Sequence, residues 1–264
     1  MRNLRVMAAC AAFLLLVNTS AHATLFGVDA GVPDQLLTIN TTTGAAAVIG
    51  PLGPAAPTPT GLAFDSNGTL FGVDSGTIDS LLSINTTTAS ASIIGPLGFG
   101  IVTGLSFDST GTLFGVDALT DQLITINTTT GAGSAVGPLG FSGLQGIAFD
   151  SAGTLFGIDV GTDQLITINP ATGAGTAIGP LGFDFVTGLA FDDDDTLFGV
   201  GSGQLLTINT ATGSATAVGP LVAAVSVGGL AFRSEPTQVP EPGTLFLFAF
   251  SLLGFGVLRK LRPI

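Results

Sequence analysis

Pairs of aspartates recur along the chain, and their carboxylates are the side chains that could do chemistry. The pairs are Asp29 and Asp34, Asp74 and Asp79, Asp117 and Asp121, and Asp159 and Asp163. Hard cations such as Ca²⁺ favour several carboxylate and carbonyl oxygens, so a ring of such pairs is a candidate cation site. Aspartate is also a common turn residue, because its side chain hydrogen-bonds to nearby backbone.

The spacing of these aspartates favours a role in turns over a role in metal binding. None of the pairs has the alternating Asp-x-Asp-x-Asp-Gly arrangement of a calcium-binding loop. A fifth copy of the pattern has Gly201-Ser202-Gly203 in its place. We interpret the pairs, and the run Asp192–Asp195, as turn formers that keep the surface soluble, and we predict neither a metal site nor a cofactor.

Catalysis by the usual side-chain pairs is excluded by composition. Between Thr24 and Phe232 there is no Lys, Arg, His, Glu, Cys or Tyr, so nucleophile–base pairs of the familiar kinds cannot form. Two aspartates could act as acid and base at a glycosidase-like separation. The candidate aspartates, however, are copied from repeat to repeat, which indicates a structural role. We therefore predict no catalytic residues and no enzyme activity.

The charge balance excludes nucleic acid as a partner. The chain has 18 acidic and 6 basic residues, and the bases are confined to its two ends. Binding to phosphates requires Lys or Arg. An acidic body of this kind instead attracts cations or basic partners.

A repeated unit determines where the aspartates lie. The sequence Thr-Leu-Phe-Gly-Val/Ile-Asp/Gly begins at residues 24, 69, 112, 154 and 196, so the unit returns after 45, 43, 42 and 42 residues. Each unit holds four candidate strands, which read Leu-Phe-Gly-Val, Gln-Leu-Leu-Thr-Ile, an Ala/Ser-rich run ending in Gly-Pro-Leu, and Gly-Leu-Ala-Phe. A period near 42 with several short strands is typical of β-propellers.

The prolines indicate where one blade ends and the next begins. The third candidate strand ends with a proline in every unit, at positions 51, 96, 138, 180 and 220. Proline is excluded from central strands, so this strand should be the outer edge of its blade and Gly-Leu-Ala-Phe the innermost strand of the next. The last such strand, at 229–232, should complete the blade begun at Thr24. We predict an all-β, five-bladed propeller of four-stranded blades over residues 24–232, with the ring closed by this pairing.

The N-terminal segment has the pattern of a secretory signal peptide. Residues 1–23 contain Arg2 and Arg5, then an apolar run, then Ala21-His22-Ala23. This order of charged, apolar and small residues predicts cleavage after Ala23. The mature chain would then begin at the first repeat.

The C-terminal segment follows a polar linker at 233–238. It reads Val239-Pro-Glu-Pro-Gly243, then the apolar run 244–258, then Arg259-Lys260-Leu261-Arg262. These three parts in this order resemble the PEP-CTERM sorting signal over residues 239–264. The resemblance implies that exosortase, a membrane protease, recognises Pro240, Glu241 and Pro242 in a Gram-negative bacterium.

The apolar run predicts a C-terminal transmembrane helix. Its fifteen residues give a helix of roughly 22 Å, shorter than the ~20 residues that span a bilayer comfortably, which suits a transient insertion. The basic cluster should stay on the cytoplasmic side. A plain C-terminal anchor helix would have the same topology.

The repeats resemble NHL-type and related secreted propellers, through units that read from Gly-Leu-Ala-Phe-Asp into Thr-Leu-Phe-Gly. Our first hypothesis is a secreted, non-enzymatic module that is sorted to the cell envelope or the exopolysaccharide matrix. Its partner would be an exopolysaccharide or a surface protein, met by the rim that carries Phe99, Phe141 and Phe183. The second hypothesis is a divalent-cation-dependent hydrolase or lactonase that uses the acidic rim.

Overall fold

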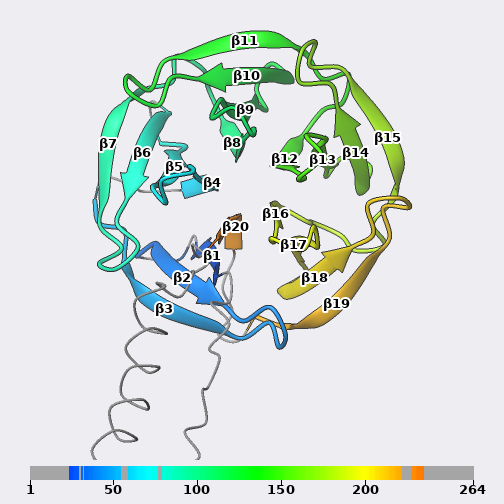
Figure 1. Ribbon diagram of the computed structural model, residues 1–264, viewed down its shortest axis with the longest axis horizontal. Coiled ribbons are helices and arrows are strands. Elements are labelled where there is room, and N and C mark those ends of the chain that lie inside the picture. Colours follow the sequence, from blue (N-terminus) through cyan, green and yellow to red (C-terminus); the bar gives the residue numbers. More distant parts are fainter. Residues whose placement is uncertain are drawn as a thin grey trace, which may run out of the picture. The chain divides into compact units, whose positions relative to one another are not determined.

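The repeat region folds as a five-bladed β-propeller (Figure 1). The computed structural model describes residues 24–29, 31, 33–54, 59–76, 79–221 and 227–234, and these form twenty strands. The predicted all-β fold with four-stranded antiparallel blades is confirmed. The predicted transmembrane helix lies outside the described residues. Within the part of the chain that is described, no helix is long and apolar enough to cross a membrane.

Each blade has four strands, which follow one another from the axis outward. Blade 1 consists of β20 (Val227–Arg233), β1 (Thr24–Asp29), β2 (Gln35–Ile39) and β3 (Ala46–Pro51). Blade 2 consists of β4 (Pro59–Phe64), β5 (Leu70–Asp74), β6 (Ser80–Ile84) and β7 (Ala91–Pro96). Blade 3 consists of β8 (Val102–Phe107), β9 (Leu113–Asp117), β10 (Gln122–Ile126) and β11 (Gly133–Pro138). Blade 4 consists of β12 (Leu144–Phe149), β13 (Leu155–Asp159), β14 (Gln164–Ile168) and β15 (Gly175–Pro180). Blade 5 consists of β16 (Gly188–Phe191), β17 (Leu197–Gly201), β18 (Gln204–Ile208) and β19 (Ala215–Pro220).

The ring closes as the prolines predicted. Every outermost strand ends at its proline, and the innermost strands carry the Gly-Leu-Ala-Phe sequence or its variants. The last strand, β20, pairs antiparallel with β1, and Thr24 lies opposite Arg233. This pairing joins the two ends of the propeller without a covalent bond and covers the inner edge of β1.

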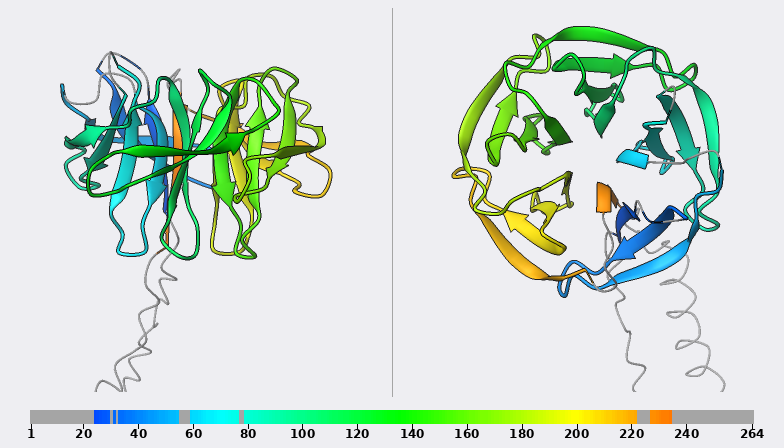
Figure 2. Two further views of the ribbon diagram at one scale, coloured as in Figure 1. Left: turned by 90° about the horizontal axis from the view of Figure 1, so that it is seen from above. Right: turned by 180° about the vertical axis from the view of Figure 1, so that it is seen from behind.

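The propeller has two rims, which Figure 2 shows from the side. The turn rim carries the connections from each innermost strand to the next strand outward, such as 65–69, and the Asn-initiated turns such as 85–90. The loop rim carries the connections between the second and third strands, such as 118–121, and the links from one blade to the next, such as 139–143. Thr24 and Arg233 both lie on the turn rim.

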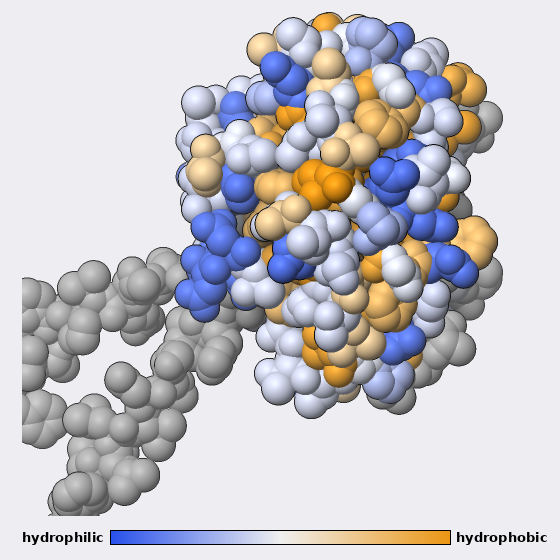
Figure 3. All heavy atoms as spheres, turned by 90° about the vertical axis from the view of Figure 1, so that its right-hand side faces the viewer, coloured by the Kyte–Doolittle hydropathy of each residue, from blue (hydrophilic) through white to orange (hydrophobic). Residues whose placement is uncertain are grey.

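The core lies between neighbouring blades. Apolar residues of blades 2 and 3, for example Val73 and Leu105, share one buried cluster, and four similar clusters fill the other junctions. A phenylalanine from the innermost strand packs against one in the preceding blade, as Phe64 does on Phe26 with ring centroids 5.3 Å apart. Such pairs contribute about 0.5–1.5 kcal/mol each beyond the area that they bury. Outside the core, polar and apolar residues are interspersed on the face seen in Figure 3.

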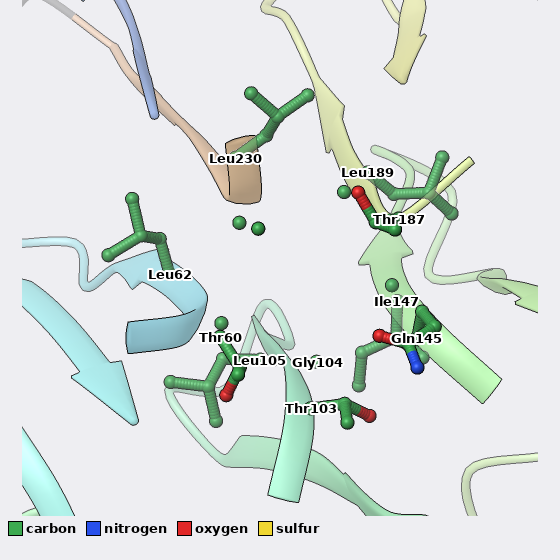
Figure 4. A pocket seen from close by; sticks show the side chains of 15 residues that line it. Thr60, Leu62, Thr103, Gly104, Leu105, Gln145, Ile147, Thr187, Leu189 and Leu230 are labelled. Carbon is green, nitrogen blue, oxygen red and sulfur yellow. The ribbon is translucent and has the colours of Figure 1, made fainter. Parts of the chain in front are cut away.

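The axis is closed near the loop rim by a ring of glycines. These are Gly61, Gly104, Gly146, Gly188 and Gly229, one from each innermost strand. A Cβ at Gly104 would lie 2.9 Å from the carbonyl oxygen of Gln145, so the strands meet backbone to backbone. In Figure 4, Leu62 and Leu230 point away from the axis. The space left at the centre is only about 10 Å³.

Threonines next to the glycine ring bond one blade to the next. The Thr60 hydroxyl donates to the carbonyl of Val102 at 2.8 Å, and the Thr103 hydroxyl donates to that of Leu144 at 2.9 Å. Thr187 donates to the carbonyl at the start of β20 at 3.0 Å. These bonds occur at three of the five junctions and hold the inner strands there at contact distance.

Candidate functional site

The aspartates of the loop rim are hydrogen-bonded into their own turns. Asp117 accepts the Leu119 N–H at 3.2 Å and the Thr120 hydroxyl at 2.5 Å. Asp159 accepts the Gly161 N–H at 2.9 Å and the hydroxyl of the next residue at 2.6 Å. In these two turns the first carboxylate therefore stabilises its own turn, as the sequence pattern predicts.

The second aspartate of a pair bonds to the link from the same blade to the next. Asp79 is buried and accepts the Val102 N–H at 2.6 Å. Burial raises the pKa of this carboxyl, hydrogen bonds from the backbone of Ile101 and Val102 oppose the rise, and the charge of Asp117 adds to it. In the neighbouring blade, Asp121 accepts the Gly143 N–H at 3.3 Å. These carboxylates hold blade junctions together.

The junction between blades 1 and 2 also brings carboxylates of two blades near each other. The pKa of Asp34 is raised, first by burial and then by the charges of Asp29 and Asp74. Even so, no three acidic, His or Cys side chains within the described residues lie close enough to hold a metal ion. On the described part of the loop rim, the charges of neighbouring carboxylates therefore repel one another.

The aspartates of the turn rim also act as turn residues. Oδ1 of Asp65 accepts the N–H groups of Asn67 at 3.0 Å and Thr69 at 2.7 Å. The equivalent turns begin with Asp108, Asp150 and Asp192 and have the same type of bond. Asn40, Asn85, Asn127, Asn169 and Asn209 form corresponding bonds in the other turns of this rim.

The run Asp192–Asp195 forms the fourth copy of this turn. Asp195 has φ of 58°, in the left-handed region where the other copies have glycine, and aspartate tolerates this region better than most residues. Its carboxylate accepts the N–H of Ser151 at 2.9 Å and the hydroxyl of the same residue at 2.5 Å. These bonds lower the pKa of Asp195 and connect blade 5 to blade 4.

The open end of the axis forms a funnel on the turn rim. Above the glycine ring, a space of about 110 Å³ widens into a cavity of about 750 Å³ at the rim. Half-buried phenylalanines line both parts, one from each innermost strand. They are Phe64, Phe107, Phe149, Phe191 and Phe232.

The expectation about exposed phenylalanines was wrong. Phe99, Phe141 and Phe183 are not free on the loop rim, because each is half-buried and packs against the core. The large exposed apolar side chains there are Ile101, Leu119 and Phe185.

Sequence reasoning also missed a polar residue that is specific to one blade. Gln145 lies beside the glycine ring, at the position that Thr60, Thr103 and Thr187 occupy in other blades. Aligning the innermost strands by their glycine would have revealed this difference.

The predicted processing residues lie outside the described part of the chain. They are Ala23, Pro240, Glu241 and Pro242. The evidence for their segment comes from comparison, since residues 238–260 match the PEP-CTERM protein-sorting motif. A comparison with curated proteins finds no match to this chain.

Solved structures resemble the propeller in fold. A protein in a nidogen/laminin complex superposes with a TM-score of 0.60 at 16% identity, covering 81% of this chain and 99% of that one. A protein of unknown function from Bacteroides caccae gives 0.53 at 12% identity, covering 81% and 99%. A gluconolactonase from Xanthomonas campestris gives 0.51 at 13% identity, covering 67% and 65%. At these identities the similarity shows the fold alone.

The two parts of the chain thus have separate identities. The body shares its propeller fold with solved structures, and the tail implies processing by exosortase and export to the cell envelope of a Gram-negative bacterium. The chain is a five-bladed β-propeller that carries a C-terminal PEP-CTERM sorting motif.

Proposed function

We propose that the propeller is a non-enzymatic module, delivered by exosortase to the cell envelope or exopolysaccharide matrix, where it acts in binding or structure. The match of residues 238–260 to the sorting motif carries this proposal. The propeller supports it, because its repeated carboxylates are engaged in turns and blade junctions. The partner would be an exopolysaccharide or a surface protein.

The proposed processing has two cuts. Signal peptidase cuts after Ala23, and exosortase recognises Pro240, Glu241 and Pro242 while the apolar run 244–258 is inserted in the membrane. The basic cluster at 259–262 stays on the cytoplasmic side, as the positive-inside rule requires. Since β20 pairs with β1 inside the described propeller, neither cut breaks the ring.

Mass spectrometry of the protein from its host tests this proposal. We expect a mature chain that begins at Thr24 and ends near residues 240–242. A Pro240→Ala/Pro242→Ala double variant should keep its tail, whereas Pro236→Ala, outside the motif, should be processed normally. A wild-type chain that still ends at Ile264 would refute the sorting proposal.

A divalent-cation-dependent hydrolase or lactonase is the second candidate. It is favoured by the raised pKa values of Asp34 and Asp79, because perturbed carboxylates cluster at active sites. Against it, Asp79 is bonded to backbone of the next blade. Melting in EGTA and in millimolar Ca²⁺ separates the candidates, since a metal site would raise the melting temperature by linkage. A large rise together with turnover of lactones or glycosides would establish the enzyme.

A further inference from the structure

The funnel on the turn rim has the size and lining of a small-molecule site. Its outer part holds about 750 Å³, within the roughly 300–1,000 Å³ that ligand pockets occupy. The glycine ring closes its inner end, so a molecule could enter only from the turn rim. Five phenylalanines, from Phe64 to Phe232, are among the residues that line both parts, and the surface exposed in the narrow part is mostly polar.

The phenylalanines are held in place by the neighbouring blades. Each is the inner member of an edge or tilted ring pair, with centroids 5.3 to 5.6 Å apart. The funnel wall is therefore preorganised by core packing and need not be ordered by a ligand. Little of the binding free energy would be lost to fixing these side chains.

The mouth of the funnel is strongly negative. Six carboxylates and one guanidinium line it, which gives a formal charge of −6 + 1 = −5. The carboxylates are those of Asp65, Asp108, Asp150, Asp192, Asp193 and Asp195, and the guanidinium is that of Arg233. A cleft lined by one sign of charge concentrates ligands of the opposite sign.

Phenylalanines and carboxylates that line the same outer cavity select one class of ligand. Phenylalanine faces are electron-rich and attract cations, and they also accept apolar groups. Anions are repelled at the mouth. We propose that the funnel binds a small organic cation, an ammonium group attached to an alkyl or aryl body. This inference rests on the proposed binding function and names the chemistry of its ligand.

Calorimetry with three matched probes tests the class of ligand. The probes are phenethylammonium, 2-phenylethanol and 3-phenylpropionate, which share a phenyl body and differ in charge. We expect the ammonium to bind at least about tenfold more tightly than the alcohol, and the carboxylate to give no measurable binding. Raising NaCl from about 20 to about 500 mM should weaken the binding of phenethylammonium several-fold, because salt screens the carboxylates.

Charge-neutral variants test the location. Asp65→Asn/Asp150→Asn removes two charges at the mouth and keeps the turns, because Asn Oδ1 accepts the same bonds, as it does at Asn85. Asp121→Asn/Asp163→Asn removes two charges on the loop rim at positions with φ near 50°, which Asn tolerates. The first variant should bind phenethylammonium at least about fivefold more weakly than the wild type, and the second less than about twofold more weakly.

Three outcomes would overturn the inference. These are no binding of phenethylammonium at about 10 mM, equal affinity for the alcohol, or equal weakening in the two variants. The last would mean that net charge, not the funnel, attracts the cation. None of these outcomes depends on tail processing, so each would leave the sorting proposal standing. An unprocessed tail in the host would refute the sorting proposal and leave the calorimetry unaffected.

Discussion

The two ends of the propeller axis are built from the same five strands and differ in one side chain per strand. Near the loop rim that side chain is the hydrogen of glycine, and the strands touch backbone to backbone. Near the turn rim it is the ring of phenylalanine, and the axis opens into the funnel. A repeat protein can thus close or open its axis by the size of one repeated residue.

The largest effect should come from adding one methyl group at the closed end. In Gly104→Ala, Cβ would lie 2.9 Å from both the Gln145 carbonyl oxygen and the Ile147 nitrogen, so backbone must move. We expect a loss of about 3 kcal/mol in the free energy of unfolding. Urea denaturation measures it.

Gly111→Ala, at the open end, is the matched control. No atom lies within 4 Å of its added Cβ, and only the left-handed φ of 86° is strained. The expected loss is about 1 kcal/mol. Equal losses in the two variants would show that the glycine ring is not a contact point.

A smaller effect should come from the threonines. Thr103→Val keeps the side-chain shape and leaves the carbonyl of Leu144 without its hydroxyl donor in a buried place. We expect a loss of about 1–2 kcal/mol. Thr110→Val, at an exposed position on the turn rim, should change stability by less than about 0.5 kcal/mol. Chemical denaturation of the two variants in parallel checks the contrast.

The architecture could be predicted from sequence because its signals are local and repeated. The outermost strand of each blade ends at a proline such as Pro138, and proline is compatible only with an edge strand. The prolines therefore predicted which four strands form a blade and how the ring closes. The run Asp192–Asp195 was recognisable as a turn because the bonds of Asp192 reach only two to four residues along the chain. The closed ring then follows from where the repeats begin and end.

The candidate site could not be predicted because it depends on distances across the axis. The glycine at position 104 and the phenylalanine at position 107 each recur in every innermost strand. Only the assembled ring shows that the glycine closes the axis and that the phenylalanine lines a cavity. Phe141 was misplaced for a similar reason. Its ring packs on Gly175 of the next outermost strand, a contact that no local pattern encodes.

The pH response should differ in sign between the two rims. The pKa of Asp34 is raised by burial and by Asp29 and Asp74, so its charged form costs stability above that pKa. Asp34→Asn should therefore raise the melting temperature at pH 7, and the gain should shrink as pH falls through the raised pKa of Asp34 toward the unfolded value of 3.8. A constant gain at every pH would contradict burial and charge repulsion as the cause.

Asp195 provides the opposite case on the turn rim. Hydrogen bonds from Ser151 lower its pKa, so it contributes stability above 3.8 that is lost as pH falls through the lowered value. Asp195→Asn should lower the melting temperature at pH 7 and converge with the wild type in acid. Melting curves at pH 7 and in acid, for both variants, give the comparison.

The most direct test of the difference between the two ends is amide chemical-shift mapping with phenethylammonium. An open end that binds and a closed end that only supports the fold predict shifts at the turn rim, among residues 64–68, 107–111 and 149–153. Residues 118–121 and 160–163 on the loop rim should not respond. Shifts that fall mainly on the loop rim would contradict the account.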